Sequence, residues 1–294
     1  MKRLFGILLT TSALILHACT TDIDESTDEL VGEDLAIADV NLEINTSDLV
    51  EEIDDAADFA TTYFDEKEGR SLGERWKKFN DCVTVTNDEA TSIRTVDFGE
   101  EGCVGIDGRV RKGKILIAHE GERNEAGFKR TVTFEGFSVD TIQVEGVRVL
   151  IYLSGTGTEK KYEATLTNGK ITMPDGFILT RSSSRTVIAT FDEDGLKTQV
   201  ARFGTASGTN RLGITYETMI EETTPLVSKM ECREGGFLPH VSGILTVNIE
   251  SKIEKTIDFG DGTCDQWVTI TQDGESREVK VEPRGKRIRP PKKD

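Results

Sequence analysis

The alternation of apolar and polar residues constrains the fold of this chain more than any other feature. From about residue 81 onward the alternation has a period of two. Successive side chains of a β-strand point to opposite faces, so this period is typical of strands with one buried face. The alternating stretches are rich in Val, Ile, Thr and Phe, which suit a pleated surface. The clearest of them are 82–86, 114–118, 129–134, 144–152, 185–190 and 243–249.

Turn dipeptides accompany these stretches. Asn-Gly and Asp-Gly supply the positive φ angles that two-residue hairpins require. They occur at Asp107-Gly108, Asn168-Gly169, Asp175-Gly176, Asp194-Gly195 and Asp273-Gly274. No ten-residue helical period follows residue 80, which argues against a parallel α/β fold. We therefore predict a mainly β domain over 70–282, with about twelve to fifteen antiparallel, hairpin-joined strands in a barrel-like, sandwich or two-lobed arrangement.

The first eighteen residues have the organisation of a signal peptide. Lys2 and Arg3 precede an apolar run, 4–16, that suits a signal peptide and is short for a membrane span. The run ends in Leu16-His17-Ala18-Cys19, which resembles the lipobox of bacterial lipoproteins. In that family the cysteine is acylated and becomes the new N-terminus, so the resemblance implies lipidation at Cys19. Plain secretion with cleavage after Ala18 is the alternative.

The charge of the chain is concentrated in one segment. The net charge is −17, and residues 20–68 contain eighteen acidic residues against one basic residue, Lys67. We interpret 19–46 as an acidic, flexible tether. The acidic balance also argues against nucleic-acid binding, which needs a basic surface.

A helix is predicted between the tether and the β domain. Ser47 suits an N-cap, and apolar residues recur at spacings of three or four over 47–69. The apolar stripe of this amphipathic helix is expected to dock on the β domain, the alternative being a partner protein. The last twelve residues, 283–294, are basic and are predicted to be a disordered tail.

Five cysteines are present, and lipidation of Cys19 leaves an even number. In an exported chain the remaining four can form two disulfides in three possible connectivities. We favour Cys82–Cys103 and Cys232–Cys264, because each pair frames a copy of the same motif. The motif T-[VI]-D-F-G-x-x-x-C covers 95–103 and 256–264, within an internal repeat of about 80–120 and 230–282.

The repeated motif predicts a strand that ends in a tight glycine-rich turn. Asp97 and Gly99 form this turn in the first copy, and Asp258 and Gly260 form it in the second. The carboxylates are expected to accept hydrogen bonds from turn backbone N–H groups. Asp258, Asp261 and Asp265 offer a weak alternative as cation ligands, but Asx turns explain them at lower cost, and no metal or cofactor is predicted.

Further stretches extend a resemblance to a known group of proteins. Together with the repeated motif, residues 106–109, 113–117, 205–211 and 224–227 look like a group of predicted Bacteroidota lipoproteins. The resemblance covers most of 80–282. It implies a cell-envelope location and a mainly β fold, and it implies no catalytic residue.

Residues for catalysis are sparse. After removal of the signal peptide only His119 and His240 remain, no G-x-S-x-G motif occurs, and the tryptophans are Trp76 and Trp267. We predict a lipid-anchored cell-envelope protein at the outer membrane, periplasmic or surface-exposed. It is expected to act without catalysis as a binding or structural module, in contact with the membrane through its lipid. A carrier of a lipid or apolar ligand is the alternative, and a hydrolase of envelope glycans is the less favoured third class.

Overall fold

The computed structural model describes most of the chain after residue 81. The described residues are Thr46, Leu49, Val50, Ile53, Asp54, Ala56, Ala57, Ala60, 82–105, 108–210, 212–234, Phe237, 240–250 and 253–281. The chain divides into two units, Met1–Leu35 and Ala36–Asp294, and every described residue belongs to the second. The predicted signal peptide, Cys19, nearly all of the predicted tether and the predicted basic tail lie outside the described residues, as does most of the predicted helix over 47–69.

The described part of the chain is mainly β, as the alternation predicts. The elements, in order, are β1 (Thr84–Asp88), β2 (Ile93–Asp97), β3 (Cys103–Val104), β4 (Val110–Glu120), β5 (Lys129–Val139), β6 (Ile142–Gly155), β7 (Glu159–Thr172), β8 (Ile178–Phe191), β9 (Lys197–Thr209), β10 (Thr215–Ile220), β11 (Leu226–Lys229), α2 (Met230–Glu234), β12 (His240–Ile249), β13 (Ile253–Asp261), β14 (Trp267–Gln272) and β15 (Glu275–Lys280).

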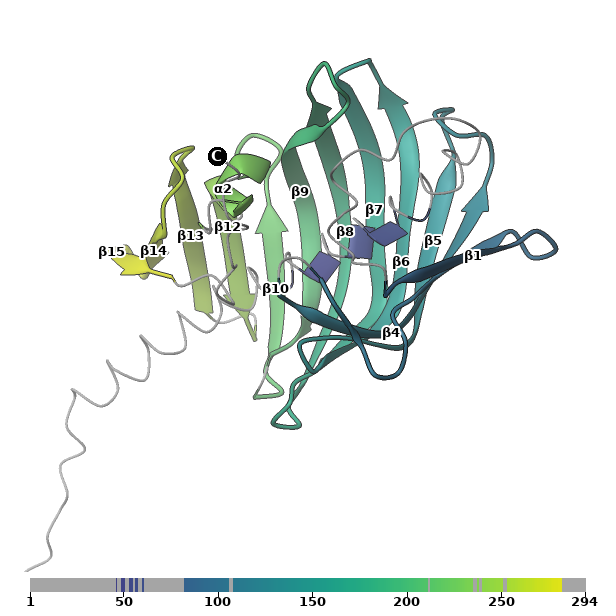
Figure 1. Cartoon of the computed structure of the whole chain (residues 1–294). Helices are drawn as coiled ribbons and strands as arrows, with labels where there is room; N and C mark the ends of the chain where they lie inside the picture. The colour runs from purple at the N-terminus through teal and green to yellow at the C-terminus, as the bar shows by residue number, and fades with distance from the viewer. Residues whose placement is uncertain are drawn as a thin grey trace, which may run out of the picture. The chain divides into compact units, whose positions relative to one another are not determined.

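The strands form one antiparallel sheet whose order follows the sequence closely. The path is β1-β2-β4-β5-β6-β7-β8-β9-β10-β12-β13-β14-β15, while β3 pairs with β4, and β11 pairs with β9 and β12. Figure 1 shows β5 to β9, the long central strands, side by side. Because most neighbours in the sheet are also neighbours in the chain, short hairpins suffice to join them.

Shifts in register bend several of the long strands. One lies between Lys112 and Lys114 in β4, and another lies between Ser242 and Ile244 in β12. Gly113 and Gly243 stand at these shifts with φ angles of 75° and 104°. A side chain there would be strained and would collide with backbone of the neighbouring segment. Such bulges increase the local twist, and the sheet is visibly curved in Figure 1.

Asn168-Gly169 does not form the turn that the sequence predicts. The pair lies inside β7, at the register shift between Leu166 and Gly169 in the pairing with β8. Asn168 takes a φ of 52°. The positive φ that Asn tolerates therefore serves a bulge here instead of a hairpin. Asp175-Gly176, Asp194-Gly195 and Asp273-Gly274 do lie between consecutive strands.

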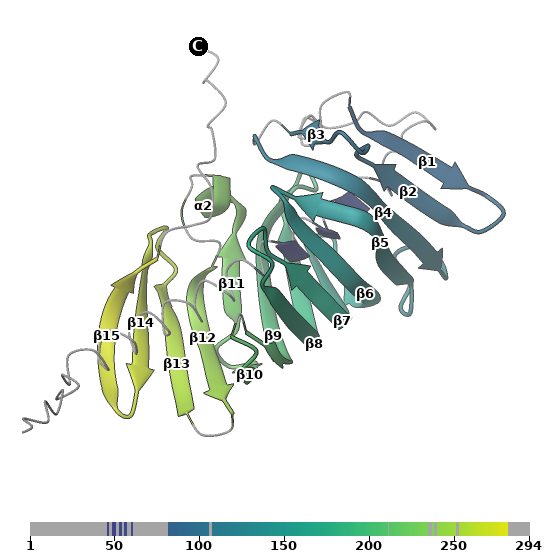
Figure 2. The same ribbon diagram turned by 90° about the horizontal axis from the view of Figure 1, so that it is seen from below.

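Two apolar clusters form the core. The first joins the described residues between Thr46 and Ala60, which are helical, to strands β2 to β6. It contains Leu49, Ile53, Ala56, Ala57, Ala60, Val96, Phe98, Cys103, Ile115, Ile117, Val132, Phe137, Val139, Ile142 and Val144. The second joins β10 to β15 and contains Ile220, Leu226, Leu245, Val247, Ile257, Phe259, Val268, Ile270, Val279 and Val281. Figure 2 shows the dark purple pieces of the helical residues beside the curved sheet.

Close packing between strands explains one glycine in particular. A Cβ at Gly208 in β9 would collide with the carbonyl oxygen of Thr180 in β8, although the φ angle of Gly208 is not in the left-handed region. The replacement Gly208→Ala is expected to lower the free energy of unfolding by about 1–3 kcal/mol, because the two strands must separate to admit the methyl group. Urea unfolding of the purified chain measures the change.

The matched control is Gly157→Ala. Nothing lies within 4 Å of a Cβ at Gly157, an exposed residue between β6 and β7. This variant should stay within about 0.5 kcal/mol of the parent chain. Equal losses in the two variants would contradict the packing argument.

Candidate functional site

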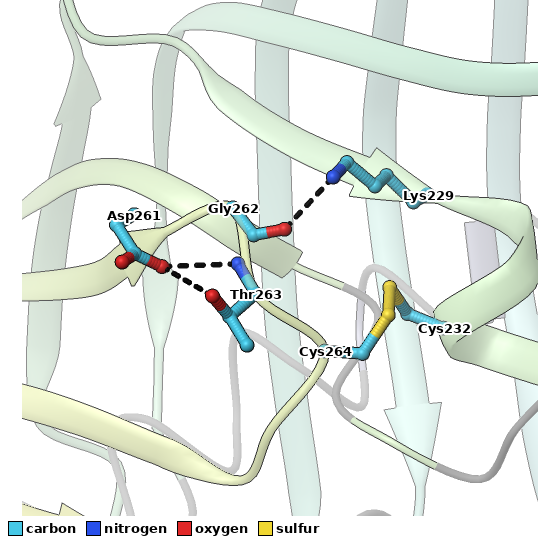
Figure 3. The surroundings of a disulfide bond; sticks show 6 residues. All are labelled: Lys229, Cys232, Asp261, Gly262, Thr263 and Cys264. Carbon is cyan, nitrogen blue, oxygen red and sulfur yellow. Dashed lines mark hydrogen bonds between the residues drawn. A yellow bond between two sulfur atoms is a disulfide. The ribbon is translucent and has the colours of Figure 1, made fainter.

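Both predicted disulfides are confirmed. Cys82, which precedes β1, is bonded to Cys103 in β3, with 5.5 Å between the Cα atoms. Cys232 in α2 is bonded to Cys264 in the loop after β13, with 5.2 Å between the Cα atoms. Figure 3 shows the second bond, beside which the Lys229 Nζ donates to the carbonyl oxygen of Gly262 at 2.8 Å. Each bond ties one copy of the repeated motif to a preceding segment.

The two D-F-G turns are built alike. The backbone N–H of Gly99 donates to Asp97 Oδ1 at 2.8 Å, and that of Gly260 donates to Asp258 Oδ1 at 2.9 Å. Both glycines have positive φ angles, 75° and 94°. The phenylalanine between them is 2% exposed in each copy, and Phe98 enters the first apolar cluster while Phe259 enters the second. The motif therefore places one aromatic ring in each cluster.

The acidic residues near the second motif are engaged in turns of their own. Asp261 Oδ1 accepts from the backbone N–H of Thr263 at 3.1 Å and from its hydroxyl at 2.7 Å (Figure 3), and Asp265 Oδ1 accepts from the N–H of Trp267 at 2.9 Å. The Thr263 hydroxyl holds the pKa of Asp261 below its ordinary value of 3.8. Glu231 lies near Cys232 and Cys264, but disulfide sulfurs are not thiolate ligands for a metal ion.

His240 pairs with a serine in the interior of the sheet. Ser228 Oγ and His240 Nδ1 are 2.9 Å apart, and the imidazole lies edge-on to Phe259. Ser228 is 0% exposed and His240 is 1% exposed. A serine nucleophile must reach its substrate, so this buried pair gives no support to hydrolysis. His119 lies in β4, stacked on Phe128, and strands β5 to β10 separate it from β12 in the sheet.

A row of buried arginines lies on one face of the central strands. We call this surface the arginine face. The residues are between 4% and 9% exposed and come from β5, β6, β8 and β9: Arg130, Arg148, Arg181, Arg185 and Arg202. Residues that pair across neighbouring strands share a face of the sheet, and so do residues two apart in one strand. Arg130 is connected through the pairs with Leu150 and Ala164 to Arg185. Arg148 is connected through the pair with Leu166 to Ser183, two residues before Arg185. Val187, two residues after Arg185, pairs with Arg202, so Arg202 lies on this face as well.

Small residues in β9 make room for the arginines of β8. Gly204, Ala206 and Gly208 are the partners of Arg185, Ser183 and Arg181 in the register of the two strands. The guanidinium groups extend across β9 to β10, where Arg181 Nη1 donates to the Tyr216 hydroxyl and Arg185 Nη2 donates to Thr218 Oγ1, each at 3.5 Å. Larger side chains at these positions of β9 would occupy the path of the guanidinium groups.

Asp54 is the acidic residue that meets the arginine face within the described residues. Its Oδ2 accepts from Arg148 Nη2 at 3.0 Å, and its Oδ1 accepts from Arg148 Nε at 3.4 Å. Arg130 Nη2 lies 3.8 Å from Oδ1. The side chains of Asp54 and Arg148 are 17% and 5% exposed, so solvent screens this pair weakly. Two-point contact between a guanidinium and a carboxylate is a strong and directional arrangement.

The arginine face is suited to binding anions. A buried guanidinium group requires a nearby anion or several hydrogen bonds, because transfer of an isolated charge from water is costly. Arginine does not lose its proton in proteins, so its positive charge persists at any physiological pH. Carboxylate and phosphate oxygens match the donor geometry of the guanidinium group. In the described part of the chain, this face holds a carboxylate through Asp54.

The arginine face was not predicted from the sequence. A signal was nevertheless present, because Arg148 has the same period-two phase as the apolar Leu150 and Tyr152. An arginine at a position that the alternation assigns to the buried face is a candidate for ion pairing or ligand binding. Which arginines share one surface depends on strand register, and the register followed only from the structure.

Comparison with protein-family models, with curated proteins and with solved structures finds no match. In the described part of the chain, none of the helical stretches has the length and apolarity of a helix that crosses a bilayer. Trp267 is the described tryptophan, and it is 47% exposed at the start of β14.

Neutralising Asp54 is expected to destabilise the protein. The variant Asp54→Asn leaves Arg148 buried without its anion, and it should lower the free energy of unfolding by about 3 kcal/mol. Lys170→Gln serves as the control, since Lys170 and Glu145 form an exposed pair at 2.8 Å whose removal should cost about 0.5 kcal/mol or less. Urea unfolding measures both variants. A loss for Asp54→Asn no larger than that of the control would show that the buried pair is energetically unimportant.

Each disulfide is expected to contribute similarly to stability. The bonds close loops of 21 and 32 residues. Chain entropy then predicts that replacing either pair of cysteines by serine lowers the free energy of unfolding by about 3–4 kcal/mol. The loss should be slightly larger for the bond that closes the longer loop. Chemical unfolding of the variants Cys82→Ser/Cys103→Ser and Cys232→Ser/Cys264→Ser tests this. A loss near zero for one pair would indicate that this bond does not constrain the unfolded chain.

Proposed function

We propose that the protein is a lipid-anchored cell-envelope protein that acts, without catalysis, as a binding or structural module at the outer membrane. The lipobox-like run that ends at Cys19 supports the anchor, and the acidic tether predicted over 19–46 supplies a spacer between the lipid and the described domain. As a flexible coil a spacer of that length has an end-to-end distance of about 25–30 Å. The domain would then stand close to the membrane that holds the lipid.

The two disulfides support export. Paired cysteines persist in oxidising compartments and are rare in the reducing cytosol. All four cysteines outside the signal region are paired within the chain. The pairing leaves Cys19 for the lipid, which is the arrangement that a lipoprotein of the envelope requires.

The observation that carries the binding function is the arginine face with Asp54 bound to it. Five guanidinium groups share one surface, and among the described residues Arg130 and Arg148 contact the Asp54 carboxylate, which favours a site for acidic groups. The other chemically distinctive pair, Ser228 and His240, is buried and does not favour a reaction. A glycan hydrolase, the third class from the sequence, gains no support from the described residues.

A carrier remains the second candidate function. Leu150, Ala164 and Leu166 are buried between the arginines on the same face, so that apolar and cationic groups alternate there. Such a surface suits an amphiphile with an anionic group better than a neutral apolar ligand. Native mass spectrometry of the purified protein distinguishes the functions, since a carrier retains a ligand and a structural module does not.

Lipidation is tested by metabolic labelling with an alkyne analogue of palmitate. The full-length chain should incorporate the label, and Cys19→Ala should not, because the acyl chains are attached to the protein through that cysteine. Thr20→Ala, a change at the adjacent residue, should label like the parent. Absence of label from the parent chain, or its persistence in Cys19→Ala, would refute the anchor. Protease treatment of intact cells then assigns the domain to the cell surface or to the periplasm.

A further inference from the structure

Trp267 is a large apolar side chain that the fold leaves on the surface. It is 47% exposed, and among the described residues of β13, β14 and β15 it is the one large apolar side chain that is exposed. Val268 and Ile270, in the same strand, are each 2% exposed in the second apolar cluster. Successive residues of a strand point to opposite faces, so Trp267 lies on the face that turns away from this cluster. We call this surface the Trp267 face.

The Trp267 face is also the opposite side of the sheet from the arginine face. Strand pairs lead from Ser183 in β8 through β9, β10, β12 and β13 to Gln272 in β14. Ser183 has the period-two phase of Arg185, and Gln272 has the phase of Ile270. Figure 2 shows β13, β14 and β15 at one end of the sheet. A ligand on the Trp267 face therefore does not meet the buried arginines.

The backbone that carries the indole ring is held by several contacts. The N–H of Trp267 donates to Asp265 Oδ1 at 2.9 Å, and the N–H of Val281 donates to the carbonyl oxygen of Gln266 at 2.8 Å. Cys264, three residues before Trp267, belongs to the second disulfide. A ring that is already positioned loses little conformational entropy when a ligand binds to it.

Polar side chains of both charges surround the ring on the same face. Lys280 in β15 pairs with Trp267. Thr269, two residues after Trp267, pairs with Glu278 on one side and with Asp258 on the other. Asp258, Glu278 and Lys280 are exposed. Within the part of the chain that the structure describes, the side chains of Glu278 and Lys280 make no hydrogen bond or ion pair.

The first copy of the repeated motif forms the same turn with different residues at these positions. There Asp97 pairs with Lys114, whose Nζ lies 3.5 Å from Asp97 Oδ2. Lys112 stands two residues before Lys114, where the second copy has Trp267 two residues before Thr269. Both copies nevertheless have the Asx turn and the disulfide. The turn therefore does not account for a tryptophan at this position.

The arrangement matches the chemistry of a sugar ring. A β-linked pyranose presents C–H groups on its faces, and these pack on the electron-rich face of an aromatic ring. Its hydroxyl groups project from the rim of the ring, where each can donate and accept a hydrogen bond. Carboxylates accept, an ammonium group donates, and a threonine hydroxyl does both. The side chains around Trp267 supply all three kinds of group.

Other classes of occupant fit the Trp267 face less well. A lipid bilayer would have to desolvate the carboxylates of Asp258 and Glu278. A specific protein partner buries about 800 Å² on each side, which one aromatic ring among charged side chains does not provide. A cationic ligand would be repelled by Lys280 beside the ring.

We propose that Trp267, with Asp258, Thr269, Glu278 and Lys280, binds a β-linked saccharide on the Trp267 face. The indole carries a sugar ring, and the polar side chains bind its hydroxyl groups. The site goes beyond the proposed function, because it requires neither the arginine face nor acylation of Cys19. Loss of saccharide binding and loss of the lipid label are therefore separate outcomes.

Isothermal titration calorimetry with two hexasaccharides tests the proposal. The probes are cellohexaose and chitohexaose, and the protein is the mature full chain in a polyoxyethylene detergent, which contains no sugar. At least one probe should bind with a Kd below about 1 mM. Chitohexaose contains the N-acetylated sugar of cell walls, whereas cellohexaose represents an external glucan, so the comparison of the two distinguishes these sources.

Replacement of the ring should remove most of the affinity. Trp267→Ala should weaken binding of the better probe at least about tenfold, because a central aromatic side chain dominates such a contact. Trp267→Phe should recover part of the loss, since a smaller aromatic face remains. Glu278→Gln should weaken binding about threefold through a weaker hydrogen bond to the sugar.

The matched control is Leu212→Ala. Leu212 is another exposed apolar residue, 62% exposed between β9 and β10, and its replacement should leave the Kd within about twofold of the parent chain. The proposal is overturned if neither probe binds, if Trp267→Ala binds like the parent, or if Leu212→Ala loses as much affinity as Trp267→Ala. Urea unfolding checks that Trp267→Ala is folded. If it is not, Glu278→Gln decides the question, and unchanged binding by that variant overturns the proposal.

Discussion

The ion pair between Asp54 and Arg148 links the helical residues between Thr46 and Ala60 to the β-sheet. Arg148 lies in β6, among the central strands, and is nearly inaccessible to solvent, so the anion beside it offsets much of the cost of burying its charge. The anion comes from a residue more than ninety positions earlier in the chain, and that residue lies between Ile53 and Ala56 of the first apolar cluster. Apolar packing positions the carboxylate, and the carboxylate in turn makes the buried arginine tolerable.

The two copies of the D-F-G motif serve the two ends of the sheet in the same way. In each copy an Asx turn closes over a positive-φ glycine, a phenylalanine enters the nearest apolar cluster, and a cysteine is bonded to an earlier segment. Between these ends, the strands follow one another as hairpins and need little more than local pairing.

Period-two alternation predicted a mainly β, antiparallel domain, because a side chain's face in a strand depends only on its position in the sequence. Repetition of the motif predicted the disulfide pairing, because equivalent turns place equivalent cysteines. The predicted turn at Asn168-Gly169 was wrong, since a residue that tolerates positive φ is equally suited to a bulge and to a hairpin. The arginine face was not predicted, since Arg130, Arg185 and Arg202 are far apart in the sequence and come together only through strand register.

By itself, the sequence determined which residues alternate, where the acidic charge is concentrated, and which cysteines frame a common motif. These are local properties of the covalent chain, and they specify strands, turns and the composition of each segment. Only the tertiary structure decided that the strands join in one sheet, that five arginines share one face of it, and that Asp54 binds there. Those outcomes depend on register and on bulges, where a shift of one residue moves every side chain to the opposite face.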